Sequence, residues 1–284
     1  MLDRYQVILV IPRVIEIFIC LICGYLLLNK DILKDRSKPG HTLKRTYFYV
    51  FISWALFTLM DLVANIIAPI GIPTDVTGTY AGYTLNFPAL LIANILRDIY
   101  AVFGVLANYF TYRSIKIIQM GEEYGTKLSK RPFILFFYSS VIVSYAVIDI
   151  MTVQVDGGSL RVLPIWDAIA PQYVMLVVLV GYMFTFVFSF LVITKIYVQN
   201  FKTLKHYPKI QLLLFLLGYL FLLLGLSWFI FTPFLVKSVE QSLGPVTFQS
   251  IGHGFWILAP VWFYIALKMG PGKRKILSDG IEEA

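Results

Sequence analysis

Long runs of apolar residues alternate with short polar segments along the whole chain. Seven of these runs are long enough to cross a bilayer as helices, since about 20 residues span the roughly 30 Å hydrocarbon core. The spans that we predict are residues 6–28, 46–70, 88–113, 132–153, 172–197, 210–235 and 246–267. The pattern therefore predicts an all-α, polytopic membrane protein, built as one seven-transmembrane-helix bundle over residues 1–284.

Composition supports this class. The chain is 58% hydrophobic and only 14% charged, with a mean hydropathy of +0.77, whereas a soluble domain carries about a quarter charged residues. The first span lacks the basic segment and the small-residue cleavage site of a signal peptide, and it contains Arg13 and Glu16. We therefore expect it to be retained as a helix.

The net charge of +8 is distributed unevenly. Of the 24 lysines and arginines, 19 lie in the connections 29–45, 119–131 and 198–209 with their adjoining helix ends, or in the tail 268–284. The other five are Arg4, Arg13, Arg97, Arg161 and Lys237. The positive-inside rule then places the N-terminus outside and the short basic C-terminal tail in the cytoplasm. The basic balance thus indicates topology and contact with membrane lipids, and not nucleic-acid binding. We expect a multi-pass protein of the plasma membrane.

Five ionisable residues interrupt the apolar pattern of the first three spans. They are Arg13 and Glu16 in the first, Asp61 in the second, and Arg97 and Asp98 in the third. A charge at the centre of a bilayer costs about 2.5–3.5 kcal/mol on insertion scales, so such residues face a partner or a water-filled cavity.

Helical spacing groups further polar residues with these charges. Asn65 follows Asp61 by one turn, Asn94 precedes Arg97 by three residues, and Gln249 precedes His253 by four, so each pair shares a helix face. All lie in the outer half of the predicted spans, and we predict a polar ligand cavity there. Its candidate residues are Arg13, Glu16, Asp61, Asn65, Asn94, Arg97, Asp98, Gln249 and His253.

An alternative interpretation of the same charges is structural. Arg13 with Glu16, and Arg97 with Asp61, would then be ion pairs that tie helices together.

Cofactor, metal and catalytic signatures are not found in the sequence. Cys20 and Cys23 lie in an apolar helix, where small packing residues are expected, and His253 has no second His or Cys at ligand spacing. There is no H-E-x-x-H, G-x-S-x-G or aspartate-rich motif. We predict no cofactor and no metal. An intramembrane lipid-modifying enzyme using Asp61 and Asp98 as acid and base is our third hypothesis of function.

Several short segments resemble heptahelical receptors, meaning G-protein-coupled receptors and prokaryotic seven-helix sensors. The segment 59–62, Leu-Met-Asp-Leu, is similar to the Ala-Asp-Leu of the receptors' second helix, and Arg113 stands where their third-helix Arg would. The segment 260–264, Pro-Val-Trp-Phe-Tyr, is similar to their Asn-Pro-x-x-Tyr, although Ala259 replaces the Asn and Tyr264 falls one place late. The resemblance implies a receptor that binds a ligand outside and signals to a cytoplasmic protein.

We rank two other hypotheses of function ahead of the enzyme. The first is a receptor-like sensor that binds a small polar or charged ligand in the outer cavity and signals to a separate cytoplasmic partner. The alternative is a small-solute or ion-coupled transporter that uses the same carboxylates. Asn108 and Thr111, which continue the polar stripe of the third span inward, favour the transporter, because a carrier needs a polar path to both faces.

Overall fold

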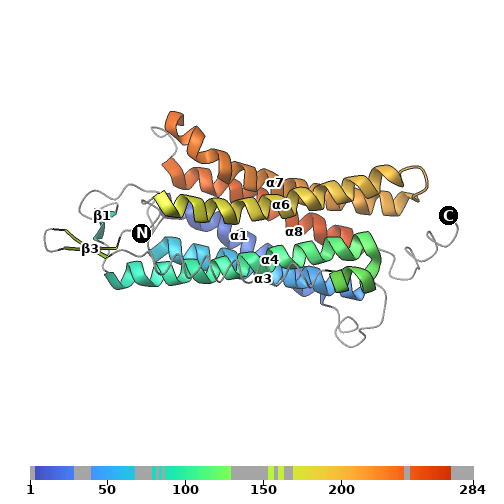
Figure 1. Cartoon of the computed structure of the whole chain (residues 1–284), viewed down its shortest axis with the longest axis horizontal. Helices are drawn as coiled ribbons and strands as arrows, with labels where there is room; N and C mark the ends of the chain where they lie inside the picture. Colours follow the sequence, from blue (N-terminus) through green and yellow to red (C-terminus); the bar gives the residue numbers. More distant parts are fainter. Residues whose placement is uncertain are drawn as a thin grey trace.

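The computed structural model describes residues 4–28, 40–67, 79–80, 83–84, 87–128, 153–156, 159–162, 169–239 and 244–269. Long helices make up most of this part of the chain (Figure 1). They are α1 (Arg4–Leu27), α3 (His41–Ile67), α4 (Phe87–Leu128), α6 (Ile169–Gln199), α7 (His206–Val239) and α8 (Gly244–Met269).

Five of the described helices, α1, α3, α6, α7 and α8, are by length and composition able to cross a membrane, which supports the membrane class. They match five of the predicted spans. The predicted span 88–113 corresponds to the first part of α4, which continues to Leu128. The predicted span 132–153 lies outside the described residues except for Val153, which begins a strand. The count of seven spans stays a prediction.

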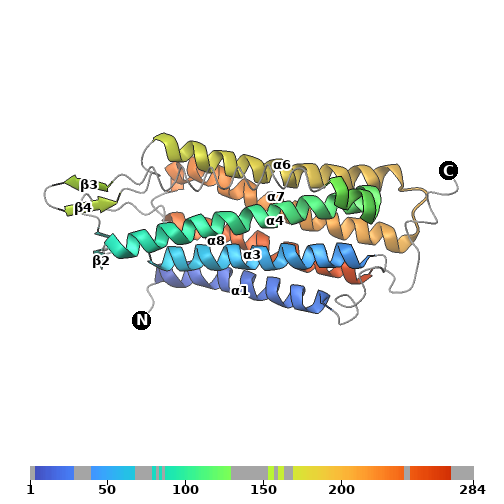
Figure 2. The same cartoon turned by 60° about the horizontal axis from the view of Figure 1, so that its bottom comes forward.

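The helices pack in a closed ring. Contacts join α1 to α3, α3 to α4, α4 to α6, α6 to α7, α7 to α8, and α8 back to α1. The three elements that carry Arg13, Asp61 and His253 are thus neighbours, and Figure 2 shows α1, α3 and α8 running side by side. Helix α1 begins at one end of this bundle, which we call its N-terminal end, and α8 ends at the other (Figures 1 and 2).

Two short antiparallel hairpins lie at the N-terminal end of the bundle, and an all-α prediction missed them (Figure 2). Strand β1 (Thr79–Tyr80) pairs with β2 (Tyr83–Thr84), and β3 (Val153–Asp156) pairs with β4 (Ser159–Val162). The sequence does contain a signal for the second hairpin. Gly157 and Gly158 separate the segments Val-Gln-Val-Asp and Ser-Leu-Arg-Val, in which apolar and polar residues alternate, and a Gly-Gly pair is favoured in two-residue hairpin turns.

At the opposite end of the bundle, α4 turns sharply at Gly121, whose positive φ of 79° favours glycine. The Glu122 carboxylate that follows accepts a hydrogen bond of 2.8 Å from the backbone N–H of Gly40. Gly40 directly precedes α3, so a negative charge lies at the N-terminus of that helix, where the helix dipole stabilises it.

Aromatic side chains fill the middle of the ring. The indoles of Trp54 on α3 and Trp256 on α8 meet edge to face with centroids 5.0 Å apart, a favourable geometry for aromatic pairs. Gly225 on α7 allows α8 to approach closely, because a Cβ there would overlap the Trp256 indole and lie 3.0 Å from the Gly252 carbonyl oxygen. The charged residues described next lie between this aromatic layer and the end of the bundle at which α1 begins.

Candidate functional site

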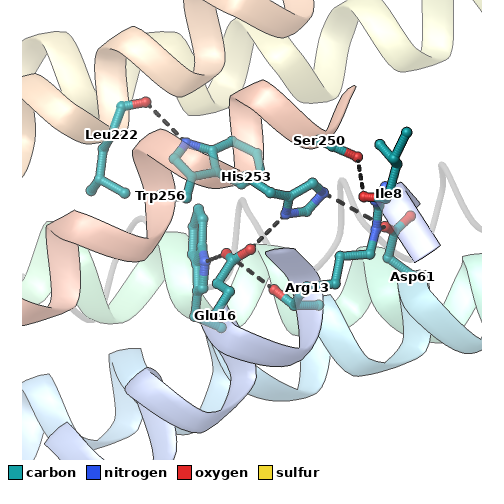
Figure 3. A network of polar contacts seen from close by, with 10 residues as sticks. Ile8, Arg13, Glu16, Asp61, Leu222, Ser250, His253 and Trp256 are labelled. Atoms are coloured by element: carbon teal, nitrogen blue, oxygen red, sulfur yellow. Dashed lines mark hydrogen bonds and ion pairs between the residues drawn. The ribbon is translucent and has the colours of Figure 1, made fainter. Parts of the chain in front are cut away.

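A buried network of charged and polar side chains joins α1, α3 and α8 (Figure 3). We call it the charge network; its members are Arg13, Glu16, Trp54, Thr58, Asp61 and His253. Arg13 and Glu16 share one face of α1 because they are three residues apart, and Trp54, Thr58 and Asp61 follow one another on α3 at spacings of four and three.

The central ion pair of the charge network joins α1 to α3. The Arg13 Nε lies 2.7 Å from the Asp61 Oδ2. Arg13 is only 1% exposed, whereas the side chain of Asp61 retains 16% exposure. The pair is therefore mostly desolvated, and Asp61 is its more accessible member.

Glu16 is fully buried and takes hydrogen bonds on both carboxyl oxygens. The Trp54 indole N–H donates to its Oε1 at 2.5 Å, and the Thr58 hydroxyl donates to the same oxygen at 3.3 Å. The Nδ1 of His253 lies 2.5 Å from the other oxygen, Oε2. Burying a carboxyl group without such partners would cost several kcal/mol, so the network explains how Glu16 is tolerated inside an apolar helix.

His253 lies between the two carboxyl groups. Its Nδ1 contacts Glu16, and its Nε2 lies 3.8 Å from the Asp61 Oδ2. One imidazole of α8 therefore faces an acid of α1 and an acid of α3. Two carboxylates and one guanidinium leave this group of four with a formal charge of −1 when His253 is neutral, and of zero when it is protonated.

A further bond ties α8 to α1 beside the network. Pro12 has no backbone N–H, so the carbonyl of Ile8, four residues earlier, loses its helical partner. The Ser250 hydroxyl donates to that carbonyl oxygen at 2.8 Å. The proline thus creates an acceptor in α1 that α8 uses.

The Trp256 indole lies beside the charge network, on the side that faces the middle of the bundle. Its ring meets His253 edge to face at 5.4 Å, and its N–H donates to the Leu222 carbonyl of α7 at 3.2 Å. Trp256 thus contacts both His253 and the backbone of α7.

A second polar cluster, which we call the tyrosine cluster, lies farther from the end of the bundle at which α1 begins. The hydroxyls of Tyr47 on α3 and Tyr219 on α7 are 2.9 Å apart, and the Ser114 hydroxyl of α4 lies 3.4 Å from that of Tyr219. Tyr47 is eleven residues from Thr58 along α3, so the two polar layers are about 17 Å apart.

The structure brings together four of the predicted ligand residues, Arg13, Glu16, Asp61 and His253. The side chains of the other five lie outside those that the structure describes: Asn65, Asn94, Arg97, Asp98 and Gln249. The ion pair of Asp61 with Arg13 was not among the pairings that we predicted. Trp54, Ser250 and the tyrosine cluster were not predicted as partners. For Trp54 the sequence does contain a signal, because helical spacing places it on the same face of α3 as Thr58 and Asp61.

Other residues considered from the sequence concern metal binding and transport. Within the described part of the chain, no group of three or more His, Cys, Asp or Glu side chains is placed to hold a metal ion. Cys20 and Cys23 are buried free thiols. Asn108 is 3% exposed, and its buried Oδ1 has no hydrogen-bond partner among the residues that the structure describes.

Comparison with protein-family models, with curated proteins and with solved structures finds no match for this chain.

Proposed function

We propose that this chain is a seven-helix sensor of the plasma membrane, with its N-terminus outside and its basic tail in the cytoplasm. A small polar or charged ligand arriving from outside rearranges the charge network, and a separate cytoplasmic protein responds to the resulting helix movement. The observation that carries the proposal is the charge network itself, in which three helices are joined by four ionisable side chains, three of them almost fully buried.

The physical argument concerns bistability. Forming a buried ion pair gains little over apolar packing, but breaking one is costly, so such networks contribute more to choosing between arrangements than to stability. A ligand that binds one arrangement of charges better than another shifts the equilibrium by its difference in affinity. The partial exposure of Asp61 gives such a ligand a first point of contact.

A route from this site to the opposite end of the bundle is built into the same helices. Trp256 connects His253 to α7, and α3 carries both Asp61 and Tyr47. Movement of α3 or α8 at the charge network would thus change the bond between Tyr47 and Tyr219.

The second candidate function is a carrier for a small solute or ion, and one observation favours it. The tyrosine cluster and the unpartnered Oδ1 of Asn108 place buried polar groups well beyond the charge network. A carrier needs polar groups along the path to both faces, whereas a sensor needs them only at its outer site.

Two-sided thiol accessibility separates the two functions. Cys20 and Cys23 are first replaced by Ala, and single cysteines are then introduced at Asn94 and Asn108. A membrane-impermeant reagent is applied from each face in turn. The sensor predicts labelling of position 94 from outside and no labelling of position 108 from either face. Labelling of position 108 from inside, altered by pH or solute outside, would replace the sensor by the carrier.

A further inference from the structure

The segment 195–209, which joins the end of α6 to the start of α7, is strongly basic. It contains four lysines and no acidic residue: Lys195, Lys202, Lys205 and Lys209. The candidate membrane span of α6 ends at Gln199, and that of α7 begins at His206. The residues between them should therefore lie at the level of the lipid headgroups, where the connection presents uncompensated positive charge.

The connection is held in one compact turn. The side-chain amide of Asn200 donates to the carbonyl of Ile196 at 3.0 Å. The carbonyl of Asn200 accepts the backbone N–H of Leu204 at 2.8 Å and the hydroxyl of Thr203 at 3.1 Å. Because these bonds satisfy carbonyls at and just beyond the end of α6, the surface of the turn is shaped before any ligand arrives.

An open hollow of about 550 Å³ lies on this turn, and its lining has a polar and an apolar part. The polar part is Gln199, Lys202 and Thr203, and the apolar and aromatic part is Tyr197, Val198 and Phe201. Lys202, Val198 and Phe201 are all exposed. A cation next to exposed apolar side chains matches a molecule that carries both an anionic group and a hydrocarbon part.

A second cation is held beside the hollow. The Nζ of Lys209 lies 4.4 Å from the centroid of the Phe201 ring, which is within the range of a cation–π interaction. The Phe201 ring in turn meets the Tyr197 ring edge to face at 5.5 Å. The apolar wall of the hollow thus positions an ammonium group next to it.

We propose that this hollow binds an anionic phospholipid, with the headgroup near Lys202 and Lys209 and the start of the acyl chains on Val198 and Phe201. A free phosphate ion would leave the apolar part of the lining uncovered, whereas a phospholipid covers both parts. The positive-inside rule places this connection at the cytoplasmic leaflet, whose anionic lipids attract basic segments. The site is independent of the charge network and serves a sensor and a carrier alike.

The test measures which lipid lies next to the hollow in the full chain. Leu191 is exposed on α6, two turns before Val198 and on the same face, where the acyl chains of such a lipid would run. A cysteine at Leu191, in the chain without Cys20 and Cys23, is labelled with a small fluorophore in phosphatidylcholine nanodiscs. Phosphatidylserine or phosphatidylcholine with a nitroxide on the acyl chain is then added as a quencher.

The ratio of the two quenching efficiencies gives the local lipid selectivity. One lysine near an anionic surface favours binding about five-fold, so position 191 should prefer phosphatidylserine at least about five-fold. The same label at Ile66, exposed near the other end of α3, should be quenched about equally by both lipids. Equal selectivity at the two positions would overturn the proposal, and the lysines would then be assigned to an acidic cytoplasmic protein.

Substitutions separate a built site from a general basic field. Lys202→Gln should lower the selectivity at position 191 about five-fold, and Lys202→Arg should retain it. The matched control is Lys268→Gln, which removes an exposed lysine from the last turn of α8 and should have little effect. Equal losses in Lys202→Gln and Lys268→Gln would overturn the site.

A final arm distinguishes the lipid from a free anion. Inorganic phosphate at constant ionic strength should leave the selectivity at position 191 unchanged, because it cannot cover Val198 and Phe201. Displacement of phosphatidylserine by millimolar phosphate would overturn the lipid as the occupant. None of these outcomes depends on the labelling of positions 94 and 108, so failure of the lipid site and failure of the sensor are observed separately.

Discussion

Arg13 is the buried cation of the charge network, and its partner Asp61 is the anion nearest to solvent. The Arg13 Nε donates to Asp61 at 2.7 Å, and a guanidinium remains charged under all ordinary conditions. Its removal would take away the permanent positive charge that the described part of the network places beside its two acids and one imidazole.

We therefore expect Arg13→Leu to destabilise the folded protein by about 3–5 kcal/mol, as observed when one member of a buried pair is removed. Adding Asp61→Asn should recover part of this loss. Unfolding in detergent, followed as a double-mutant cycle, measures both effects. The control is Lys127→Leu, which breaks the exposed pair with Glu123 and should change the stability far less, because solvent screens an exposed pair. Equal losses from Arg13→Leu and Lys127→Leu would contradict a desolvated pair.

Charge within an apolar span and helical spacing predict Arg13, Glu16, Asp61 and His253 as site residues from the sequence. These patterns could not determine their partners, because a pairing across helices depends on rotation and depth. Trp54 illustrates the limit: as an aromatic residue in an apolar span it is typical of packing, and only the approach of α1 makes it a donor to Glu16.

At the level of the helices, Pro12 and Ser250 form a matched pair. The proline frees the Ile8 carbonyl in α1, and the serine of α8 bonds to it. Prolines of membrane helices are tolerated when a neighbouring helix satisfies the freed backbone group in this way.

Ser250→Ala should cost about 1 kcal/mol, the usual net contribution of a hydrogen bond. In a Pro12→Ala background, residue 12 regains an N–H for Ile8, so the same serine substitution should cost clearly less. A double-mutant cycle of unfolding free energies gives the coupling. Additive losses would show that Ser250 and Pro12 act independently.

Gly225 sets the distance between α7 and α8. A Cβ at this position would overlap the Trp256 indole, which bonds to Leu222 and packs on Trp54. Gly225→Ala should therefore destabilise the protein by about 1–3 kcal/mol through overpacking.

The control is Gly254→Ala on α8, where a Cβ meets no atom within 4 Å. Because alanine favours helix over glycine, this variant should be stabilised by up to about 1 kcal/mol. Thermal unfolding of both variants in the same detergent is the measurement, and similar stabilities would refute close packing at Gly225.

At the scale of the whole molecule, the described helices contain two buried polar layers separated by aromatic residues. The charge network joins α1, α3 and α8, and the tyrosine cluster joins α3, α4 and α7. Helix α3 takes part in both layers, so it is the element best placed to couple them.

The arrangement of the ends predicts the orientation in the membrane. The hairpin of β3 and β4 lies at the N-terminal end, and the connection between α6 and α7 lies at the opposite end (Figure 1). That connection carries Lys202 and Lys205, and the positive-inside rule places it in the cytoplasm.

A cysteine at Ser159 should thus react with an impermeant reagent only from outside, and a cysteine at Thr203 only from inside. The chain without Cys20 and Cys23 is the control for background labelling. Labelling of both positions from one face would contradict the topology, and the reverse pattern would invert it.

The sequence by itself determined the membrane class, the positions of five apolar helices and the residues whose charge demands a partner. These follow from local quantities, because hydropathy over about 20 residues and the helical repeat do not depend on the rest of the fold. Only the tertiary structure decided that α8 closes the ring against α1, that Arg13 bonds to Asp61, and that His253 lies between two acids. Those contacts join residues up to 242 positions apart, and packing between helices, which no local pattern encodes, brings them together.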